Sequence, residues 1–231
     1  MYLPVTLAPA GAVDMWDTNM AGTADDPIAI LVDDDTAVCE ALGELLNSVG
    51  IDTIAFSSST ELLEAELPDR PGCVVLDVRM PGLSGLDLQH RLVEHGILTP
   101  IVFLTGHGDI AMSVQAMKAG AVDFLTKPVR DQTFLDAISR AIATDIEQRR
   151  AADETRRNVE LYDTLTPRER QVFRSVVKGS LNKQIAFELQ ISEVTVKLHR
   201  SSMMKKMNAP STAHLFGAWQ SLPDDIRSNN G

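Results

Sequence analysis

Four short apolar runs in the first half of the chain each end in a polar residue. The runs span residues 28–32, 73–76, 101–104 and 122–126, and the polar residues that follow them are Asp33 with Asp34, Asp77, Thr105 and Lys127. Such runs are typical of strands that are buried on both faces of a parallel sheet. Parallel sheets carry their functional groups just beyond the carboxyl ends of their strands. We therefore expect these five side chains to meet at one edge of one sheet.

The expected cluster combines three carboxylates, a hydroxyl and an ammonium group. Close carboxylates repel one another unless a cation lies between them, and Mg²⁺ favours carboxylate and phosphate oxygens. A carboxylate can attack phosphorus to form an aspartyl-phosphate, while Lys127 and Thr105 hold the other phosphoryl oxygens. Each Asp taken alone could equally cap a following helix. The coincidence of four strand ends favours a phosphoryl-transfer site.

Segments with helical spacing separate the apolar runs, which indicates an α/β domain with a doubly wound parallel sheet. We expect five strands in the flavodoxin-like order 2-1-3-4-5, with the second strand at residues 53–56. Helices are expected at residues 36–48, 59–66 with Ser59 as N-cap, 86–95, 110–118 and from 131 towards 150.

Charge divides the chain into an acidic and a basic part. Residues 1–165 hold 11 Lys and Arg against 27 Asp and Glu, a balance of −16, and residues 166–231 hold 10 against 5, a balance of +5. A basic module joined to an acidic one is expected of a nucleic-acid binder with a separate regulatory domain. A basic surface without a nucleic-acid partner is the alternative. Residues 146–163 carry both signs of charge with almost no apolar anchors, which predicts a solvated helical linker.

The basic part opens with a capping box, in which Thr166 is the N-cap, Pro167 the first helical residue and Glu169 the third. Further helices are expected at residues 182–189, from Ser192 to residue 207 and from Ser211 onwards, before a polar, irregular tail after residue 223. Two short helices joined by a tight turn, the second of them basic, describe an all-α helix-turn-helix domain.

The helical wheel of residues 193–207 separates a core stripe from a DNA-facing surface. Val196, Met203 and Met207 share the core stripe. On the opposite face, Lys197 and Ser201 are candidates for base edges, Val194 and Leu198 for thymine methyl groups, and Lys205, Lys183 and Thr195 for phosphates. His199 falls nearer the core and is expected to be packed and hydrogen-bonded. For Arg200, a pair with Glu169 and a phosphate contact are equally good expectations.

Both halves resemble known modules. Leu31-Val32-Asp33-Asp34-Asp35, Val75-Leu76-Asp77-Val78-Arg79-Met80-Pro81-Gly82, Leu104-Thr105-Gly106-His107-Gly108-Asp109 and Lys127-Pro128 resemble the receiver domain of a two-component response regulator. Leu165-Thr166-Pro167-Arg168-Glu169-Arg170, Asn182-Lys183-Gln184-Ile185-Ala186 and Thr195-Val196-Lys197-Leu198-His199-Arg200 resemble the LuxR-type helix-turn-helix. Together they resemble the FixJ/NarL family of response regulators, and FixJ-like members in particular.

The resemblance implies a role for each residue at the sheet edge. It makes Asp77 the phosphoacceptor, with Mg²⁺ held by the side chains of Asp34 and Asp77, the backbone carbonyl of Arg79 and, through water, Asp33. It assigns phosphoryl contacts to Thr105 and Lys127, and an aromatic switch to Phe124. Asp35 is expected only to start a helix.

The resemblance also implies the partners. Phosphorylation would move Thr105 and Phe124 and pair two receivers through a face that includes Val114, Lys118 and Asp123, with Lys118 and Asp123 as a candidate cross-dimer ion pair. Solvated surface is the alternative for those two charges. The implied partners are a sensor histidine kinase, double-stranded DNA, RNA polymerase and a second copy of the chain, in the cytoplasm. The implied regulation is of transcription, more often activation.

Two other functions remain as alternatives. The receiver could act without phosphorylation, as a docking module of a DNA-binding regulator. The chain could also be a phosphatase with Asp33 as nucleophile in an Asp-x-Asp-x-Thr/Val pattern, but Ala37 departs from that pattern. A phosphatase would also leave the basic second domain without a role, so a non-enzymatic regulator is expected.

These observations give a domain plan. A loose tail covers residues 1–26, with Met1, Met15 or Met20 as the start. The receiver covers residues 27–145, the linker 146–163, the helix-turn-helix domain 164–222 and a flexible tail 223–231. No run reaches the roughly 18 apolar residues that a membrane span requires. Cys39 and Cys73 are expected to be free thiols in the core.

Overall fold

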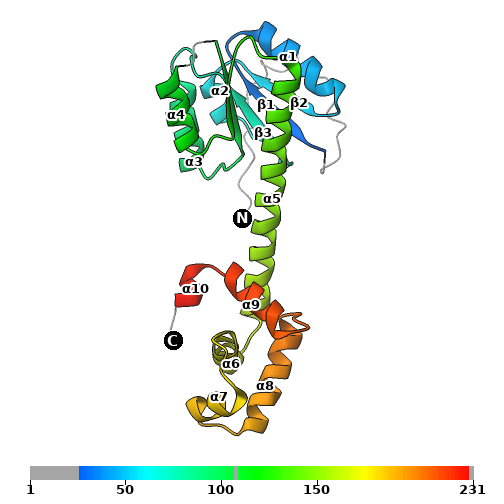
Figure 1. Cartoon of the computed structure of the whole chain (residues 1–231), viewed down its shortest axis with the longest axis vertical. Coiled ribbons are helices and arrows are strands. Elements are labelled where there is room, and N and C mark those ends of the chain that lie inside the picture. The colour runs from blue at the N-terminus through cyan, green and yellow to red at the C-terminus, as the bar shows by residue number, and fades with distance from the viewer. Residues whose placement is uncertain (1–25, 107–108, 229–231) are drawn as a thin grey trace, which may run out of the picture. The chain divides into compact units, whose positions relative to one another are not determined.

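The computed structural model describes residues 26–106 and 109–228, so residues 1–25 of the predicted N-terminal tail, with its alternative starts, lie outside the described residues. The chain forms two compact units, which divide between Ile146 and Glu147 (Figure 1). Unit 1 is an α/β sandwich and unit 2 is entirely helical. Each unit has its own hydrophobic core, and each is described below by itself.

In the described part of unit 1, parallel strands form one five-stranded sheet in the order β2-β1-β3-β4-β5. The strands are β1 (Ile28–Val32), β2 (Asp52–Phe56), β3 (Gly72–Leu76), β4 (Ile101–Thr105) and β5 (Asp123–Thr126). Every residue of β1, β3 and β4 is buried, because helices cover both faces of the sheet. The predicted fold class and strand order are confirmed.

Helices pack on the sheet in two layers (Figure 1). One layer holds α1 (Thr36–Ser48) and the first part of α5 (Asp131–Asp163), whose buried residues include Leu46 and Phe134. The other holds α2 (Ser59–Glu64), α3 (Gly85–Glu94) and α4 (Ile110–Lys118), which bury Leu62, Leu88 and Ala116. Cys39 and Cys73 are free and buried, and burial raises the pKa of their thiols to about 11 and about 12.

The start of α2 differs by one residue from its sequence prediction. Ser58 is the N-cap, because its hydroxyl accepts a hydrogen bond from the Glu61 amide at 3.2 Å. Ser59 is instead the first helical residue, and its buried hydroxyl donates to the carbonyl of Leu83 at 2.9 Å. The helix ends at Glu64 because Ala65 is extended. Asp35 caps α1, as expected for a residue that only starts a helix.

The prediction of a solvated linker is wrong for its last turn. Helix α5 is continuous to Asp163, and its last residues pack against the core of unit 2. Tyr162 is buried there, and its ring lies 5.8 Å from that of Phe173, which lies 5.5 Å from that of Trp219. Tyr162, with the partly buried Val159 and Leu161, thus anchors a segment that otherwise has a charged sequence.

Unit 2 continues with a tight succession of helices. They are α6 (Pro167–Val177), α7 (Asn182–Leu189), α8 (Glu193–Lys206), α9 (Thr212–Ser221) and α10 (Asp224–Ser228). The predicted capping box of Thr166 and Glu169 is present. Gln190, with φ of 54°, makes the turn between α7 and α8. Helix α10 lies where an irregular tail was expected, and Ile226 packs on the core.

A buried carboxylate joins the first and third helices of this group. Glu169 accepts hydrogen bonds from Lys206 and Ser202 of α8, both at 2.6 Å. Burial raises the pKa of the Glu169 carboxyl, whereas the hydrogen bonds from Lys206 and Ser202 lower it more, so that the pKa is about 2. The carboxylate therefore stays charged over the whole range in which the protein is expected to work.

Unit 2 should lose stability as the pH falls from about 4.5 towards about 2, because the unfolded chain binds a proton at Glu169 more readily than the folded unit does. The contribution at neutral pH is on the order of 3 kcal/mol. In a Trp16→Phe background, Trp219 fluorescence during urea unfolding at a series of pH values measures this slope. Glu169→Gln should flatten it, whereas the exposed Glu193→Gln should not. Equal slopes for wild type and Glu169→Gln would contradict the assignment.

Candidate functional site

The ends of four strands bring the predicted polar side chains to one edge of the sheet. Carboxylate oxygens of Asp33, Asp34 and Asp77 lie within 4.8 Å of one another. Lys127, after β5, forms an ion pair with Asp33 and places its Nζ 3.3 Å from Oδ2 of Asp77. Thr105, the last residue of β4, is fully buried. These five residues therefore lie at the carboxyl edge of the sheet, as predicted.

The charges in this cluster do not cancel. Asp33 and Asp77 are buried, whereas Asp34 is exposed. Burial raises the pKa of Asp33, and the neighbouring Asp77 adds to that effect, while Lys127 opposes it. For Lys127, burial lowers the pKa, but the hydrogen bond and the charge of Asp33, with the charge of Asp77, raise it above its ordinary value. One ammonium group thus pairs with two of the three acidic side chains.

The loop after β3 holds the Asp77 carboxylate in place. The Arg79 amide donates to Asp77 Oδ1 at 3.1 Å, and the Gly85 amide closes the loop on the Val78 carbonyl at 3.0 Å. A Cβ atom on Gly85 would lie 2.2 Å from the Asp77 carbonyl oxygen. The backbone therefore passes the site at a distance that only glycine allows.

The cluster has the composition of a magnesium site. Its ligand atoms are oxygens, its net charge is negative, and the exposed Asp34 leaves one side open to water. Mg²⁺ prefers a few carboxylates together with several waters and phosphate oxygens. The residues present therefore fit the ion that the sequence predicts.

Phe124 lies on β5, which β4 separates from β3 and the Asp77 that follows it. Its ring is half-buried, and its centroid lies 5.9 Å from that of Phe103 on β4. The Lys127 amide donates to the Thr105 carbonyl at 2.9 Å, which ties the ends of β4 and β5 together. Thr105, Phe124 and Lys127 are thus joined through the same two strands.

In unit 2, helix α8 presents two different faces, as its helical wheel predicts. Val196, Met203 and Met207 are buried in the core. Val194 and Leu198 are each 66% exposed, and Lys197, Ser201 and Lys205 are exposed too. Thr195 is half-buried, and its hydroxyl hydrogen-bonds to that of Ser192 at 2.8 Å, which leaves it less available than predicted for a phosphate. The exposed apolar side chains of Val194 and Leu198 lie beside basic residues, and this combination marks the face as an interaction surface.

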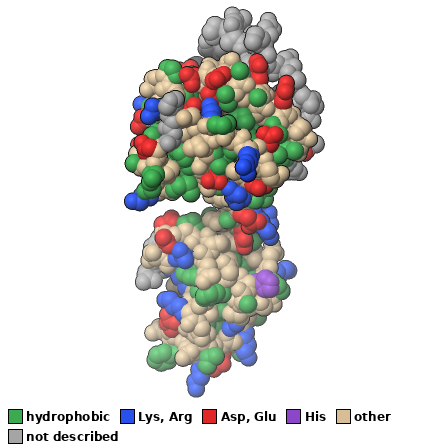
Figure 2. Space-filling model, turned by 45° about the horizontal axis from the view of Figure 1, so that its top comes forward, with side chains coloured by type: hydrophobic (Ala, Val, Ile, Leu, Met, Phe, Trp, Pro, Cys, Tyr) green, Lys and Arg blue, Asp and Glu red, His purple; other side chains and the backbone are tan. Residues whose placement is uncertain are grey.

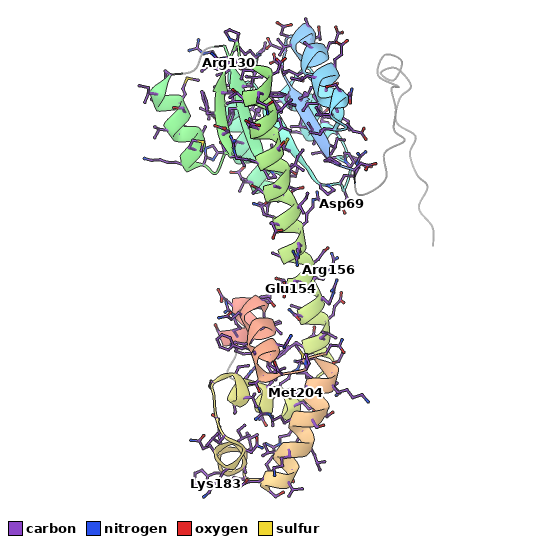
Figure 3. The ribbon with its side chains drawn as sticks, turned by 45° about the vertical axis from the view of Figure 1, so that its right-hand side comes forward. Asp69, Arg130, Glu154, Arg156, Lys183 and Met204 are labelled. Carbon is purple, nitrogen blue, oxygen red and sulfur yellow. The ribbon has the colours of Figure 1, made fainter. Side chains whose placement is uncertain are left out.

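Helix α7 adds basic and apolar side chains to that surface. Lys183 is exposed and extends away from α7, at the end of unit 2 in Figure 3. Lysine and arginine are also the more frequent charged side chains on the face of unit 2 that Figure 2 shows. Phe187, one turn after Lys183, is 88% exposed, and sequence reasoning missed it. The i, i+4 spacing of Lys183 and Phe187 was the signal that could have placed both on one face.

The position of Arg200 rules out one of the two expectations for it. Its guanidinium donates to Asn182 Oδ1 at 3.2 Å and to Thr212 Oγ1 at 3.0 Å. The predicted pair with Glu169 is therefore wrong, because Lys206 occupies that carboxylate. Arg200 instead joins α8 to the starts of α7 and α9. His199 is half-buried, and no hydrogen bond to its ring occurs among the described residues.

Comparisons with known proteins agree with both halves. Residues 29–139 match the response regulator receiver domain, and residues 163–217 match the bacterial regulatory proteins of the luxR family. The chain is 49% identical over 196 residues to nodulation protein W of Bradyrhizobium diazoefficiens, which covers 84% of this chain and 86% of that protein. It is 41% identical over 185 residues to the transcriptional regulatory protein FixJ of Azorhizobium caulinodans, with 80% and 88% covered.

The chain is a FixJ-like response regulator. The solved structure of response regulator StyR superimposes with a TM-score of 0.74 at 45% identity, over 84% of this chain and 98% of that one. Response regulators of this type are regulators of transcription rather than enzymes, and phosphorylation of the receiver is the usual control of the family. A receiver implies a histidine kinase as partner, and a luxR-type domain implies DNA. None of the helices in the described part of the chain is long and apolar enough for a membrane span.

Two of the three residues of the predicted dimer face are exposed in this response regulator. Val114 and Lys118 are exposed on α4. Asp123, at the start of β5, forms an ion pair with Arg140 of α5 in the same chain. A cross-dimer pair of Lys118 and Asp123 would therefore have to share Asp123 with Arg140.

Gly85→Ala should disturb the receiver severely, because its Cβ would meet the backbone of Asp77 rather than a movable side chain. Overpacking of this kind costs about 3 kcal/mol. Urea unfolding of the receiver and labelling by a phosphoryl donor should both be impaired. Gly43→Ala, at a buried glycine of α1 whose nearest contact would be 3.4 Å, is the matched control and should leave both nearly unchanged. A Gly85→Ala chain with wild-type stability and labelling would contradict the steric argument.

Proposed function

We propose that this response regulator is switched by phosphorylation of Asp77, and that the switch controls how unit 2 engages promoter DNA. The single observation that supports it best is the position of Asp77. Its carboxylate lies beside two further carboxylates and 3.3 Å from the ammonium group of Lys127. That combination suits a carboxylate nucleophile that has to accept a negatively charged phosphoryl group.

In the proposed reaction an Asp77 oxygen attacks the phosphorus of a phosphohistidine on the sensor kinase. The new O–P bond forms as the P–N bond breaks, and the histidine nitrogen takes up a proton. Lys127 would bind a phosphoryl oxygen, since it already reaches Asp77, and Thr105 would bind another once the group is present. Bound at Asp34, Asp77 and the Arg79 carbonyl, with Asp33 through water, Mg²⁺ would offset charge on the transferring group.

Phosphorylation replaces the single negative charge of the Asp77 carboxylate with the roughly two negative charges of an acyl phosphate, at an edge that is already acidic. Lys127 would then exchange part of its ion pair with Asp33 for the phosphoryl group. In the proposed switch, movement of Thr105 towards the phosphoryl group leaves room for Phe124, whose ring is half-buried now. Those changes reach the face of Val114, Lys118 and Asp123, through which we propose that two receivers pair.

A dimer would present two copies of helix α8 to a two-fold related operator. We propose that Lys197 and Ser201 read base edges, that Val194 and Leu198 contact thymine methyl groups, and that Lys183, Thr195 and Lys205 contact phosphates. The exposure of six of these seven residues on one surface supports the assignment. We propose that the DNA-bound dimer contacts RNA polymerase, and that it does so in the cytoplasm.

Asp77→Asn should abolish labelling, because an amide oxygen is a poor nucleophile and the amide binds Mg²⁺ weakly. Radiolabelled acetyl phosphate with Mg²⁺ measures this, and EDTA should prevent labelling of the wild type. Asp87→Asn, a change of an exposed α3 carboxylate outside the cluster, is the matched control. A labelled Asp77→Asn chain would move the phosphoacceptor elsewhere. Normal promoter activation by an unlabelled Asp77→Asn chain would favour the docking module instead.

Phosphate contacts and base contacts should differ in how their loss changes the salt dependence and the sequence preference of DNA binding. Lys183→Ala should weaken binding to specific and non-specific DNA alike, and should reduce the slope of log affinity against log salt by about 0.9. Lys197→Ala should cost about 1–3 kcal/mol for the operator and relax its sequence preference. Fluorescence anisotropy on operator and scrambled duplexes at several salt concentrations distinguishes the two. Lys178→Ala, between α6 and α7, is the control. Equal losses on both duplexes for Lys197→Ala would remove it from base reading.

A further inference from the structure

Gln89 of helix α3 is a buried polar side chain that reaches the neighbouring helix α4. It is 2% exposed, and its amide nitrogen donates to the carbonyl oxygens of Ala119 at 3.2 Å and Ala116 at 3.5 Å. The last carbonyls of a helix have no partner within the helix. Ala116 has a second donor in the Ala121 amide at 3.1 Å, so Ala119 depends more on Gln89. A side chain of α3 therefore caps the C-terminal end of α4.

Besides this cap, few side chains hold α4 on the sheet, and Met112 is only partly buried against the core. The fully buried residue of α4 is Ala116, which contributes only a methyl group to the core. Ile110 is 84% exposed, and Val114 and Met117 are exposed as well. Helix α3, in contrast, buries Leu88 and Leu92 completely. Gln89 thus sits on a firmly packed helix and contacts a loosely packed one beside it (Figure 1).

The cap is incomplete on the glutamine side. Within the described residues, the buried Oε1 of Gln89 has no hydrogen-bond partner. An unsatisfied buried acceptor is unfavourable, so the present contact gains two donor interactions at the expense of one acceptor. Beside it, α3 and α4 border a groove lined by His90, Ala111, Val114, Gln115, Lys118 and Ala119. The hydrogen-bond contact that holds α4 is therefore incompletely satisfied, and one face of the helix borders an open groove.

We propose that Gln89 is a positioning residue of the phosphorylation switch, which holds the end of α4 against α3 while Asp77 is unphosphorylated. Release of the Ala119 carbonyl lets α4 take the position in which two receivers pair. This inference rests on the proposed function, because α4 carries Val114 and Lys118 of the proposed dimer face. It adds the contact that keeps the unphosphorylated receiver from pairing.

Gln89→Met tests the proposal, since methionine keeps the length of the side chain and removes both donors. The unphosphorylated full-length chain should dimerise about threefold more tightly or better, because one neutral hydrogen bond corresponds to about a two- to tenfold change in an equilibrium constant. The affinity of the phosphorylated dimer should change less. Sedimentation equilibrium with and without acetyl phosphate and Mg²⁺ measures both constants.

A matched control separates this effect from general loss of stability. Ile28→Val removes one buried methyl group at a comparable cost of about 1 kcal/mol. Ile28 begins β1, so it lies at the opposite edge of the sheet from Asp77. This substitution should leave both dimer constants unchanged. Equal shifts in the two variants, or no shift in Gln89→Met while the wild type dimerises on phosphorylation, would overturn the role of Gln89 and leave the switch intact. A wild type that stays monomeric when phosphorylated overturns both.

A measurement on the wild type needs no variant. The amides of Gly120 and Ala121 bond to the Met117 and Ala116 carbonyls at 3.1 Å, directly beside the Gln89 contact. Phosphorylation should speed hydrogen exchange at these amides in the full-length chain, because the end of α4 leaves its cap. Exchange that is unchanged or slower on phosphorylation contradicts the proposal.

Discussion

The ion pairs of Lys127 are the interaction on which the rest of unit 1 depends. One ammonium group lies among Asp33, Asp34 and Asp77 and cannot neutralise them all. The fold tolerates the excess charge because β1, β3 and β4 are completely buried and hold the strand ends at fixed spacing. Any cation or phosphoryl group that enters must change how Lys127 is shared. A chemical event at Asp77 is thereby converted into a rearrangement of neighbouring side chains.

The two helical layers differ in how firmly they hold the sheet. On one side, α5 is tied to the sheet by the buried Asp145, which accepts from the Gly72 amide at 2.8 Å, and by the Arg140–Asp123 pair. On the other side, α4 rests on Ala116, the partly buried Met112 and the capping amide of Gln89. A change at the sheet edge will therefore displace α4 more readily than α5, because fewer contacts have to break. The loosely held helix is also the one that carries Val114 and Lys118.

In unit 2, polar contacts join helix α8 to three other helices. Glu169 joins α8 to α6, and Arg200 joins it to α7 and α9. The exposed side chains of α8 are thus presented by a rigid element, which favours sequence-dependent contacts over adaptable ones. The aromatic contact of Tyr162 adds the end of α5 to the same core. Polar residues here position the surface that we propose to face DNA.

Local patterns in the sequence were enough to place most elements and the sheet edge. Continuous apolar runs gave β1, β3 and β4, and the polar residues after them, such as Asp77 and Lys127, had to share one edge because parallel strands end together. Capping chemistry located the starts of α6 and α8 to the residue. These signals work because each depends on neighbours within a few positions along the chain.

Side-chain pairing required the three-dimensional structure. Glu169 selects Lys206 rather than Arg200, Asp123 selects Arg140, and Gln89 caps a helix whose carbonyls follow some 30 residues later. Tyr162 shows the same limit, since one aromatic residue in a charged segment has no periodicity to reveal its burial. Such choices depend on distances between elements, and hydrophobic periodicity carries no information about which of several charged groups comes closest. Hydrophobic and capping patterns in the sequence therefore determine the helices, the strands and the sheet edge, whereas tertiary packing determines which side chains pair.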